Sequence, residues 1–146
     1  LMRFEPNLVN VVPAKVTMTV DLRNTDELAL RAAEASFRAL CDDVARAEGV
    51  HIEARPLARF EPVEFDTEMV DLVETTAVTL GCSTMRLPSG AGHDAQMLAR
   101  VCPTSMVFVP SVNGLSHNIA EFTQPADITA GADVLLQVVL AKAMEG

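Results

Sequence analysis

The 146-residue sequence contains no tryptophan and no tyrosine, so it offers neither residue for an aromatic recognition surface. Basic residues are also few: 11 Lys and Arg stand against 20 Asp and Glu, and the formal net charge is -9. Proteins that bind nucleic acid usually carry a basic surface, so this balance argues against a nucleic-acid partner. No apolar run approaches the roughly 18 residues of a membrane span, so we expect no membrane partner either.

Cysteine is the next scarce residue, with three widely spaced copies at Cys41, Cys82 and Cys102. An odd number at this spacing is typical neither of a disulfide framework nor of a zinc knuckle. The pattern suits a reducing compartment, and we expect a cytoplasmic protein. Hydrophobic residues make up 49% of the sequence, which is the composition of a chain with a core rather than of a disordered one.

The first 62 residues show the pattern of an antiparallel sheet crossed by one helix. Polar and apolar residues alternate over residues 15–23, which predicts a half-buried strand with residues 1–4 as its hairpin partner. Asn24, with Glu27 as its capping-box partner, is expected to begin a helix that ends at Gly49. A second alternation over residues 52–60 predicts another half-buried strand, so the order is β-β-α-β.

After Pro62 the pattern changes to strands alternating with helices, which is typical of an α/β layer. We expect a domain boundary near residues 60–65. The expected helices begin at Asp66 or Thr67, at Ala95 and at about Pro125, and they end near Leu80, Val101 and Met144. The expected strands lie at residues 84–87 and 106–109. The second of these is a continuous apolar run, which predicts a strand covered on both faces.

Two polar loops follow these expected strands, one over residues 89–94 and one over residues 113–118. In open α/β sheets, sites collect beyond the carboxyl ends of strands. Gly90 and Gly92 either permit a tight turn or form a backbone cradle for an oxyanion or carboxylate. The loop lacks the Lys-Ser/Thr of a Walker motif and the full spacing of a dinucleotide fingerprint.

The three histidines differ in their surroundings. His117, in a loop rich in Gly, Ser and Asn, is a candidate metal ligand or general base, or else an ordinary surface residue. His93 is the next candidate, although its neighbour Asp94 is equally suited to cap the following helix. His51 lies on the polar face of the predicted strand and is expected to be solvated. A catalytic zinc needs about three protein ligands, so these residues define no complete active site by themselves.

Several motifs taken together resemble a known family, and they occur in one order along nearly the whole chain. They are Asn10-Val-Val-Pro13, Asp21-Leu-Arg23, Ser89-Gly-Ala-Gly-His-Asp-Ala95, Phe108-Val-Pro-Ser111 and Gly114-Leu-Ser-His117. This combination resembles the C-terminal portion of the hydantoinase/carbamoylase amidases. That group includes N-carbamoyl-L-amino-acid hydrolases, β-ureidopropionases and allantoate amidohydrolases, and it belongs with the two-zinc aminoacylase and carboxypeptidase metallopeptidases.

The resemblance implies an α/β fold in two parts. Residues 1–62 match the later part of a lid and dimerisation domain, an incomplete antiparallel β-β-α-β unit. Residues 63–146 match the C-terminal part of a zinc-dependent catalytic domain, an incomplete α/β layer. The rest of the catalytic domain, with the other metal ligands and the catalytic Glu base, is expected upstream, so the isolated chain is expected to be inactive.

The resemblance also implies roles for individual residues. His117 matches the family's C-terminal metal ligand, and Asn10 and Arg23 match lid residues that hold the substrate's carboxylate. Gly92, with its neighbours Gly90 and His93, matches a loop that lines the substrate. The implied cofactor is Zn²⁺, two ions per full-length subunit, with Mn²⁺, Co²⁺ or Ni²⁺ as alternatives. Ile119 departs from the family pattern, whereas Glu121 stands where the family has a Glu.

The function implied is that of a fragment of a metal-dependent amidohydrolase that cleaves linear carbamoyl or ureido C–N bonds. Its partners would be a small substrate with carboxylate and ureido groups and a second copy, paired through the lid. N-carbamoyl-L-amino acids are the expected substrates, and allantoate or β-ureidopropionate are the alternatives. A hypothesis of another class is a non-catalytic dimerisation or assembly module whose sheet only pairs subunits.

Overall fold

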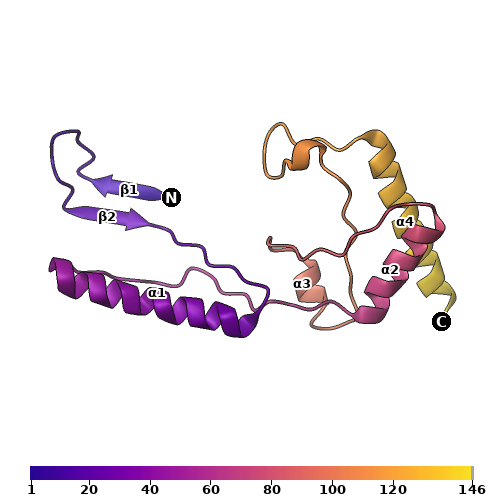
Figure 1. The fold of residues 1–146 in the computed structure, drawn as a ribbon, viewed down its shortest axis with the longest axis horizontal. Helices are drawn as coiled ribbons and strands as arrows, with labels where there is room; N and C mark the ends of the chain where they lie inside the picture. Colours follow the sequence, from indigo (N-terminus) through magenta and orange to yellow (C-terminus); the bar gives the residue numbers. More distant parts are fainter. Residues whose placement is uncertain (146) are drawn as a thin grey trace. The chain divides into compact units, whose positions relative to one another are not determined.

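The computed structural model describes residues 1–145. The chain divides into two compact units, Leu1–Pro62 and Val63–Gly146, and the division falls at the change of pattern after Pro62. The first unit holds strands β1 (Met2–Glu5) and β2 (Lys15–Met18) and helix α1 (Glu27–Glu48) (Figure 1). The second holds helices α2 (Thr67–Thr79), α3 (Ala95–Leu98) and α4 (Pro125–Met144) and the 3₁₀ turn η1 (Val112–Gly114). In the described part of the chain, no helix is long and apolar enough to cross a membrane.

Strands β1 and β2 form an antiparallel hairpin, as the alternation predicts. Met2 lies opposite Met18 and Phe4 opposite Val16, so these apolar side chains share one face. The expected burial of that face is wrong, because both strands are exposed along their whole length. In the described residues no Cα of helix α1 lies within 8 Å of a Cα of either strand, and Phe4 and Val16 stay 41% and 49% exposed.

The N-cap of helix α1 lies two residues after the expected one. Asp26, not Asn24, is the N-cap, and its Oδ1 accepts the backbone N–H of Ala29 at 3.0 Å. The Asn24 side chain makes its hydrogen bond just before the helix, where its Oδ1 accepts the N–H of Asp26 at 2.9 Å. Gly49 ends the helix as predicted, with φ at 65°, a left-handed conformation that glycine adopts without a Cβ penalty.

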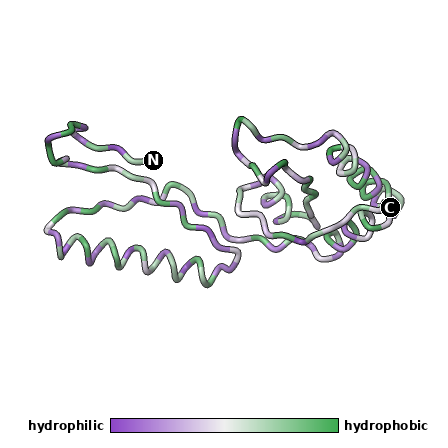
Figure 2. The backbone as a smooth tube through the Cα atoms, turned by 45° about the horizontal axis from the view of Figure 1, so that its top comes forward, coloured by the Kyte–Doolittle hydropathy of each residue, from purple (hydrophilic) through white to green (hydrophobic). Residues whose placement is uncertain are grey.

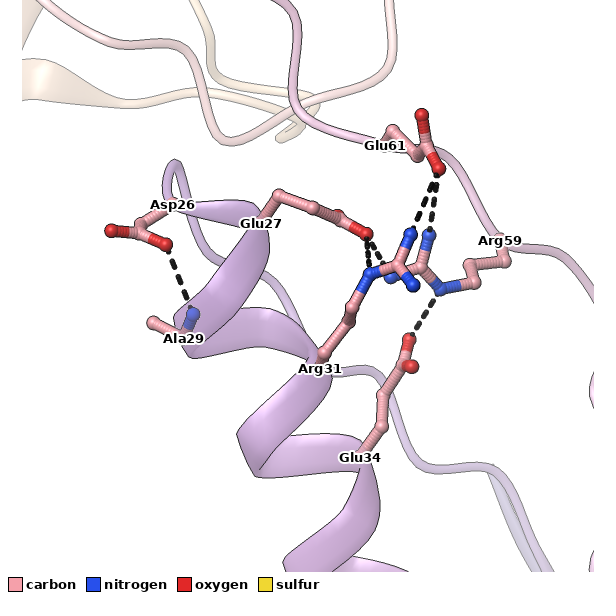
Figure 3. Close-up of polar contacts among 7 residues, drawn as sticks. All are labelled: Asp26, Glu27, Ala29, Arg31, Glu34, Arg59 and Glu61. Atoms are coloured by element: carbon pink, nitrogen blue, oxygen red, sulfur yellow. Dashed lines mark hydrogen bonds and ion pairs between the residues drawn. The ribbon is translucent and has the colours of Figure 1, made fainter.

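The segment expected as a strand over residues 52–60 is not a strand in the structure. A strand needs a hydrogen-bonded neighbour, and this segment is held to α1 by ion pairs instead (Figure 3). Arg59 Nη2 lies 2.7 Å from Glu27 Oε1, and Arg59 Nε lies 2.9 Å from Glu34 Oε1. Arg31 reaches Glu61 at 3.3 Å and Glu27 at 2.5 Å. The hydrogen bond from Arg59 is the main reason that the pKa of Glu27 lies below its usual value.

The core of the second unit forms where α2 packs against α4. Ala77, Val134 and Val138 are buried there together. Cys82 and Val107, which pack against them, lie on the two segments that lead to the candidate loops. The N–H of Asp66 also donates to the carbonyl of Thr104 at 3.1 Å, which ties the start of α2 to the second segment.

The strands expected at residues 84–87 and 106–109 are not formed. The run from Met106 to Val109 was expected to be covered on both faces, yet Phe108 is 61% exposed. The structure is therefore a mixed chain of helices with one two-stranded antiparallel sheet, compatible with part of an α/β fold. The two expected strands are absent because neither segment has a ladder partner within the described residues, and an extended segment becomes a strand only beside another one.

Most of the apolar residues remain exposed. Figure 2 shows hydrophobic segments throughout the chain, but in residues 1–145 only Leu30, Ala77, Thr104, Val134 and Val138 are buried. The accessible surface is 11,713 Å², whereas a folded monomer of 15.7 kDa exposes about 7,300 Å². The chain therefore has far more apolar surface than its own elements cover.

A close approach between α4 and the second extended segment depends on a glycine. A Cβ placed on Gly131 would lie 2.4 Å from Cγ1 of Val109, well inside van der Waals contact. The absence of a side chain at this position lets Val109 lie directly against the helix.

We predict that Gly131→Ala destabilises the second unit. Ala gains about 1 kcal/mol of helix propensity over Gly, but overpacking costs about 1–3 kcal/mol, so the expected net loss is about 1 kcal/mol. Chemical denaturation measures it. In a Val109→Ala background, where the clashing Cγ1 is absent, Gly131→Ala should be neutral or stabilising. Undiminished stability of Gly131→Ala alone would contradict the predicted clash.

We also predict that Arg59→Gln lowers the stability of the first unit at pH 7 and that the effect fades in acid. The pKa of Glu27 lies below its ordinary 4.5, so its contribution is present above that value and is lost as pH falls through the folded-state pKa. Urea denaturation at pH 7 and at about pH 3 measures the difference. Arg38→Gln is the control, because Arg38 lies on α1 and makes no ion pair in the described residues. An equal loss at both pH values would show that Arg59 acts through packing alone.

Candidate functional site

The loop over residues 89–94 holds the imidazole of His93 in a defined position. Oγ of Ser89 lies 2.6 Å from Nε2 of His93 and accepts the N–H of Ala91 at 3.3 Å. The backbone N–H of His93 donates to Oε1 of Gln96 at 3.3 Å. The His93 ring also packs edge-on against Phe108, with centroids 5.5 Å apart. The contact with Phe108 connects this loop, through the half-buried His93, to the segment that leads to His117.

The two glycines of this loop are not required for a tight turn. Neither Gly90 nor Gly92 has a positive φ. A Cβ on Gly90 would meet no atom within 4 Å, and a Cβ on Gly92 only Oε1 of Gln96 at 3.9 Å. Their small size therefore leaves open space beside the backbone, which a ligand that contacts main-chain groups would use. Asp94 takes the N-cap position of α3 but makes no capping hydrogen bond.

His117 lies in a loop that is closed and braced by its own hydrogen bonds. The N–H of Val112 donates to the carbonyl of Phe122 at 2.8 Å and closes the base of the loop. Asn118 braces the far side, where Oδ1 accepts the N–H of Ala120 and the backbone carbonyl accepts that of Glu121, each at 2.9 Å. The loop is therefore an ordered support for the exposed His117.

The backbone of His117 adopts an unusual conformation. Its φ is 55°, in the left-handed region that residues other than glycine seldom occupy. The N–H of His117 donates to Oε2 of Glu121 at 2.8 Å, and hydrogen bonds to a carboxylate are among the stronger ones in proteins. This bond stabilises the conformation that directs the imidazole, and it gives Glu121 a structural role in the loop.

In the first unit, Arg23 already grips a carboxylate. Arg23 Nε lies 3.0 Å from Asp21 Oδ1, and Arg23 Nη2 lies 2.7 Å from Asp21 Oδ2, which makes two parallel bonds. These hydrogen bonds lower the pKa of Asp21 and raise that of Arg23. The pair is exposed to solvent. The geometry is the one expected for recognition of a ligand's carboxylate.

Asn10 lies in the turn between β1 and β2. Arg23 lies beyond the opposite end of β2, so the strand separates the two residues. Within one copy of the first unit, the structure does not bring these two predicted carboxylate ligands together.

The described residues do not form a complete metal site. In residues 1–145, no three side chains of His, Cys, Asp or Glu are arranged to hold a metal ion. His117 supplies one exposed imidazole, a chemically suitable donor for zinc. Any metal would therefore need further ligands in addition to His117.

Sequence reasoning missed two partners of His93, namely Ser89 and Phe108, and it gave Glu121 no role. The spacing offers only a weak signal: Ser89 and Glu121 each stand four residues from the histidine that they contact. One hollow among the described residues lies elsewhere. Its volume is about 410 Å³, and it is lined by residues of the first unit, Arg31, Glu34, Arg38 and Arg59.

Comparison with known proteins gives a consistent result. Residues 4–141 match the sequence profile of Peptidase family M20/M25/M40. The chain is 44% identical over 142 residues to an N-carbamoyl-L-amino-acid amidohydrolase of Rhizobium meliloti, covering 97% of this chain and 34% of the relative. It is 40% identical over 134 residues to an allantoate amidohydrolase of Escherichia coli strain K12, covering 89% of this chain and 32% of that relative.

Solved structures agree with the sequence comparison. The fold is similar to a crystal structure of an amidase of the hydantoinase/carbamoylase family from Burkholderia vietnamiensis, with a TM-score of 0.91 and 41% identity. That similarity covers 98% of this chain and 35% of the amidase. The chain therefore spans about a third of the length of the relatives that it matches.

Proposed function

The chain belongs to Peptidase family M20/M25/M40, and we propose that it is part of a metal-dependent amidohydrolase acting on linear carbamoyl or ureido C–N bonds. The observation that carries this proposal is the close agreement with a hydantoinase/carbamoylase amidase over 98% of the chain. We use "complete enzyme" for this chain together with the segments that correspond to the remaining two thirds of its relatives. Its proposed location is the cytoplasm.

The large exposed apolar surface supports the view that the chain works as part of a larger structure. Leu135, Leu136 and Val139 on α4 are each more than half exposed. Burial of apolar surface yields about 25 cal/mol per Å², so a covering segment would stabilise this helix considerably. We propose that the rest of the complete enzyme supplies that cover and the ladder partners of the extended segments.

The first unit is the proposed lid, and its role is to hold the carboxylate of the substrate. The guanidinium of Arg23 shows by its bonds to Asp21 that it can grip a carboxylate in two parallel bonds. Asn10 is the second proposed contact, from the other end of β2. The uncovered apolar face of the hairpin, which carries Phe4 and Val16, supports a homodimer paired through this unit.

The second unit is the proposed catalytic part. Gly90 and Gly92 leave the backbone of their loop accessible to the ureido end of a substrate, and His93 stands in the same loop as a hydrogen-bonding group. His117 is the proposed metal ligand of this chain, and the other ligands and the base Glu would come from outside it. Bound there, a zinc ion would act as a Lewis acid toward the carbonyl oxygen of the substrate.

The direct test is release of ammonia from N-carbamoyl-L-amino acids, allantoate and β-ureidopropionate by the complete enzyme. We predict that Arg23→Gln raises KM about 10- to 100-fold, with a smaller change in kcat, because a hydrogen bond to a charged group contributes about 1.5–3 kcal/mol. Arg3→Gln, in β1 of the same unit, is the matched control. If the complete enzyme releases no ammonia from any of these substrates, the proposed function is wrong.

A second prediction concerns the metal. His117→Ala in the complete enzyme should lower the zinc content and abolish turnover, while circular dichroism shows an unchanged fold. Exposed His51 is the control position, since His51→Ala should change neither quantity. Elemental analysis after dialysis measures the zinc. Full metal content together with full activity in His117→Ala would rule out its role as a ligand.

A further inference from the structure

We propose that Ser89 is a positioning residue for His93. The Ser89 hydroxyl holds Nε2 of the His93 ring, so Nδ1 is the ring nitrogen that donates to the substrate. The inference rests on the proposed function, because that function places His93 beside the substrate. It adds a residue to which neither the sequence patterns nor the resemblance assigns a role, and it specifies the kind of atom that His93 recognises.

Two independent contacts fix the imidazole. Oγ of Ser89 lies 2.6 Å from Nε2, a short hydrogen bond that restricts rotation of the ring. Phe108 packs against the ring edge at an interplanar angle of 66°, which restricts its tilt. In residues 1–145, Nδ1 has no hydrogen-bond partner, so it is the nitrogen left to bind a ligand.

The proposed tautomer has the Ser89 hydroxyl as donor to Nε2, and the surroundings of the hydroxyl favour this direction. Oγ of Ser89 accepts the N–H of Ala91 at 3.3 Å, which occupies one of its lone pairs. Donation to Nε2 gives the hydroxyl hydrogen a partner, whereas the reverse direction leaves it with none in the described residues, and with this direction the neutral ring carries its proton on Nδ1. His93 in this tautomer is a donor, and its natural partner is an oxygen acceptor such as the carbonyl oxygen of a carbamoyl or ureido group.

A serine this close to a histidine also has the geometry of a nucleophile with its base. Two observations favour positioning over covalent chemistry. The Ser89 hydroxyl oxygen is engaged by Ala91 within its own loop. No carboxylate in the described part of the chain orients the His93 ring, as the third member of such an arrangement would.

The test compares Ser89→Ala and Ser89→Thr in the complete enzyme, with Ser83→Ala as a matched control at an exposed serine of the same segment. Loss of one hydrogen bond that holds a substrate-binding group should lower kcat/KM about tenfold in Ser89→Ala and leave clear residual turnover. Ser89→Thr, which keeps the hydroxyl, should stay within about twofold of the wild type. Ser83→Ala should be unchanged.

Nitrogen NMR of enzyme labelled with ¹⁵N-histidine gives a readout that does not depend on turnover. His93, assigned by its absence from the spectrum of His93→Asn, should show the Nδ1–H tautomer in the wild type and in Ser89→Thr. In Ser89→Ala it should become a mixture of tautomers. An unchanged tautomer in Ser89→Ala would overturn the proposal, and so would a changed tautomer with unchanged kcat/KM.

Complete loss of turnover in Ser89→Ala at unchanged KM would overturn the proposal in another way, because it would identify Ser89 as a nucleophile. Failure of the proposed function gives a different result. In that case His93→Asn keeps full activity, or the enzyme hydrolyses none of the substrates, whatever the NMR shows of the Ser89–His93 bond. Full activity of His93→Asn would also end the role of Ser89 in catalysis.

Discussion

The packing of α2 against α4 is the contact on which both candidate loops of the second unit depend. Ala77, Val134 and Val138 bury one another there, and Cys82 and Val107 bring the two extended segments onto the same small core. One segment leads to the loop of His93 and the other to the loop of His117. Gly131 permits the close approach of the second segment. A small core therefore supports two ordered loops although most of the apolar surface stays exposed.

The parts of the fold that depend on local interactions could be predicted from the sequence. The hairpin, the end of α1 at Gly49 and the whole of α4 follow from alternation, a left-handed cap and a Pro at the first helical turn. The strands at residues 52–60, 84–87 and 106–109 could not be predicted correctly. Alternation reports that a segment is amphipathic, but a strand also needs a partner, and the described residues provide none.

The candidate site likewise has features that could be predicted from the sequence and features that could not. The residue types and their order indicated His93, His117 and Arg23, but they could not show what holds each side chain. The bonds of Ser89 to His93 and of Glu121 to His117 exist only because each loop folds back on itself. The left-handed backbone of His117 is equally hidden, because that conformation is uncommon for any residue other than glycine. Side-chain support in loops follows from conformation, which composition and spacing do not determine.

The central claim is that this chain forms a working third of an amidohydrolase. The most direct test replaces the matching third of the Rhizobium meliloti relative, which is 44% identical, with this chain and measures ammonia release from N-carbamoyl-L-amino acids. We predict a folded chimera with measurable turnover, since the chain is 44% identical over 142 residues to the segment that it replaces. A chimera that folds and retains zinc but releases no ammonia from any ureido substrate would contradict the account.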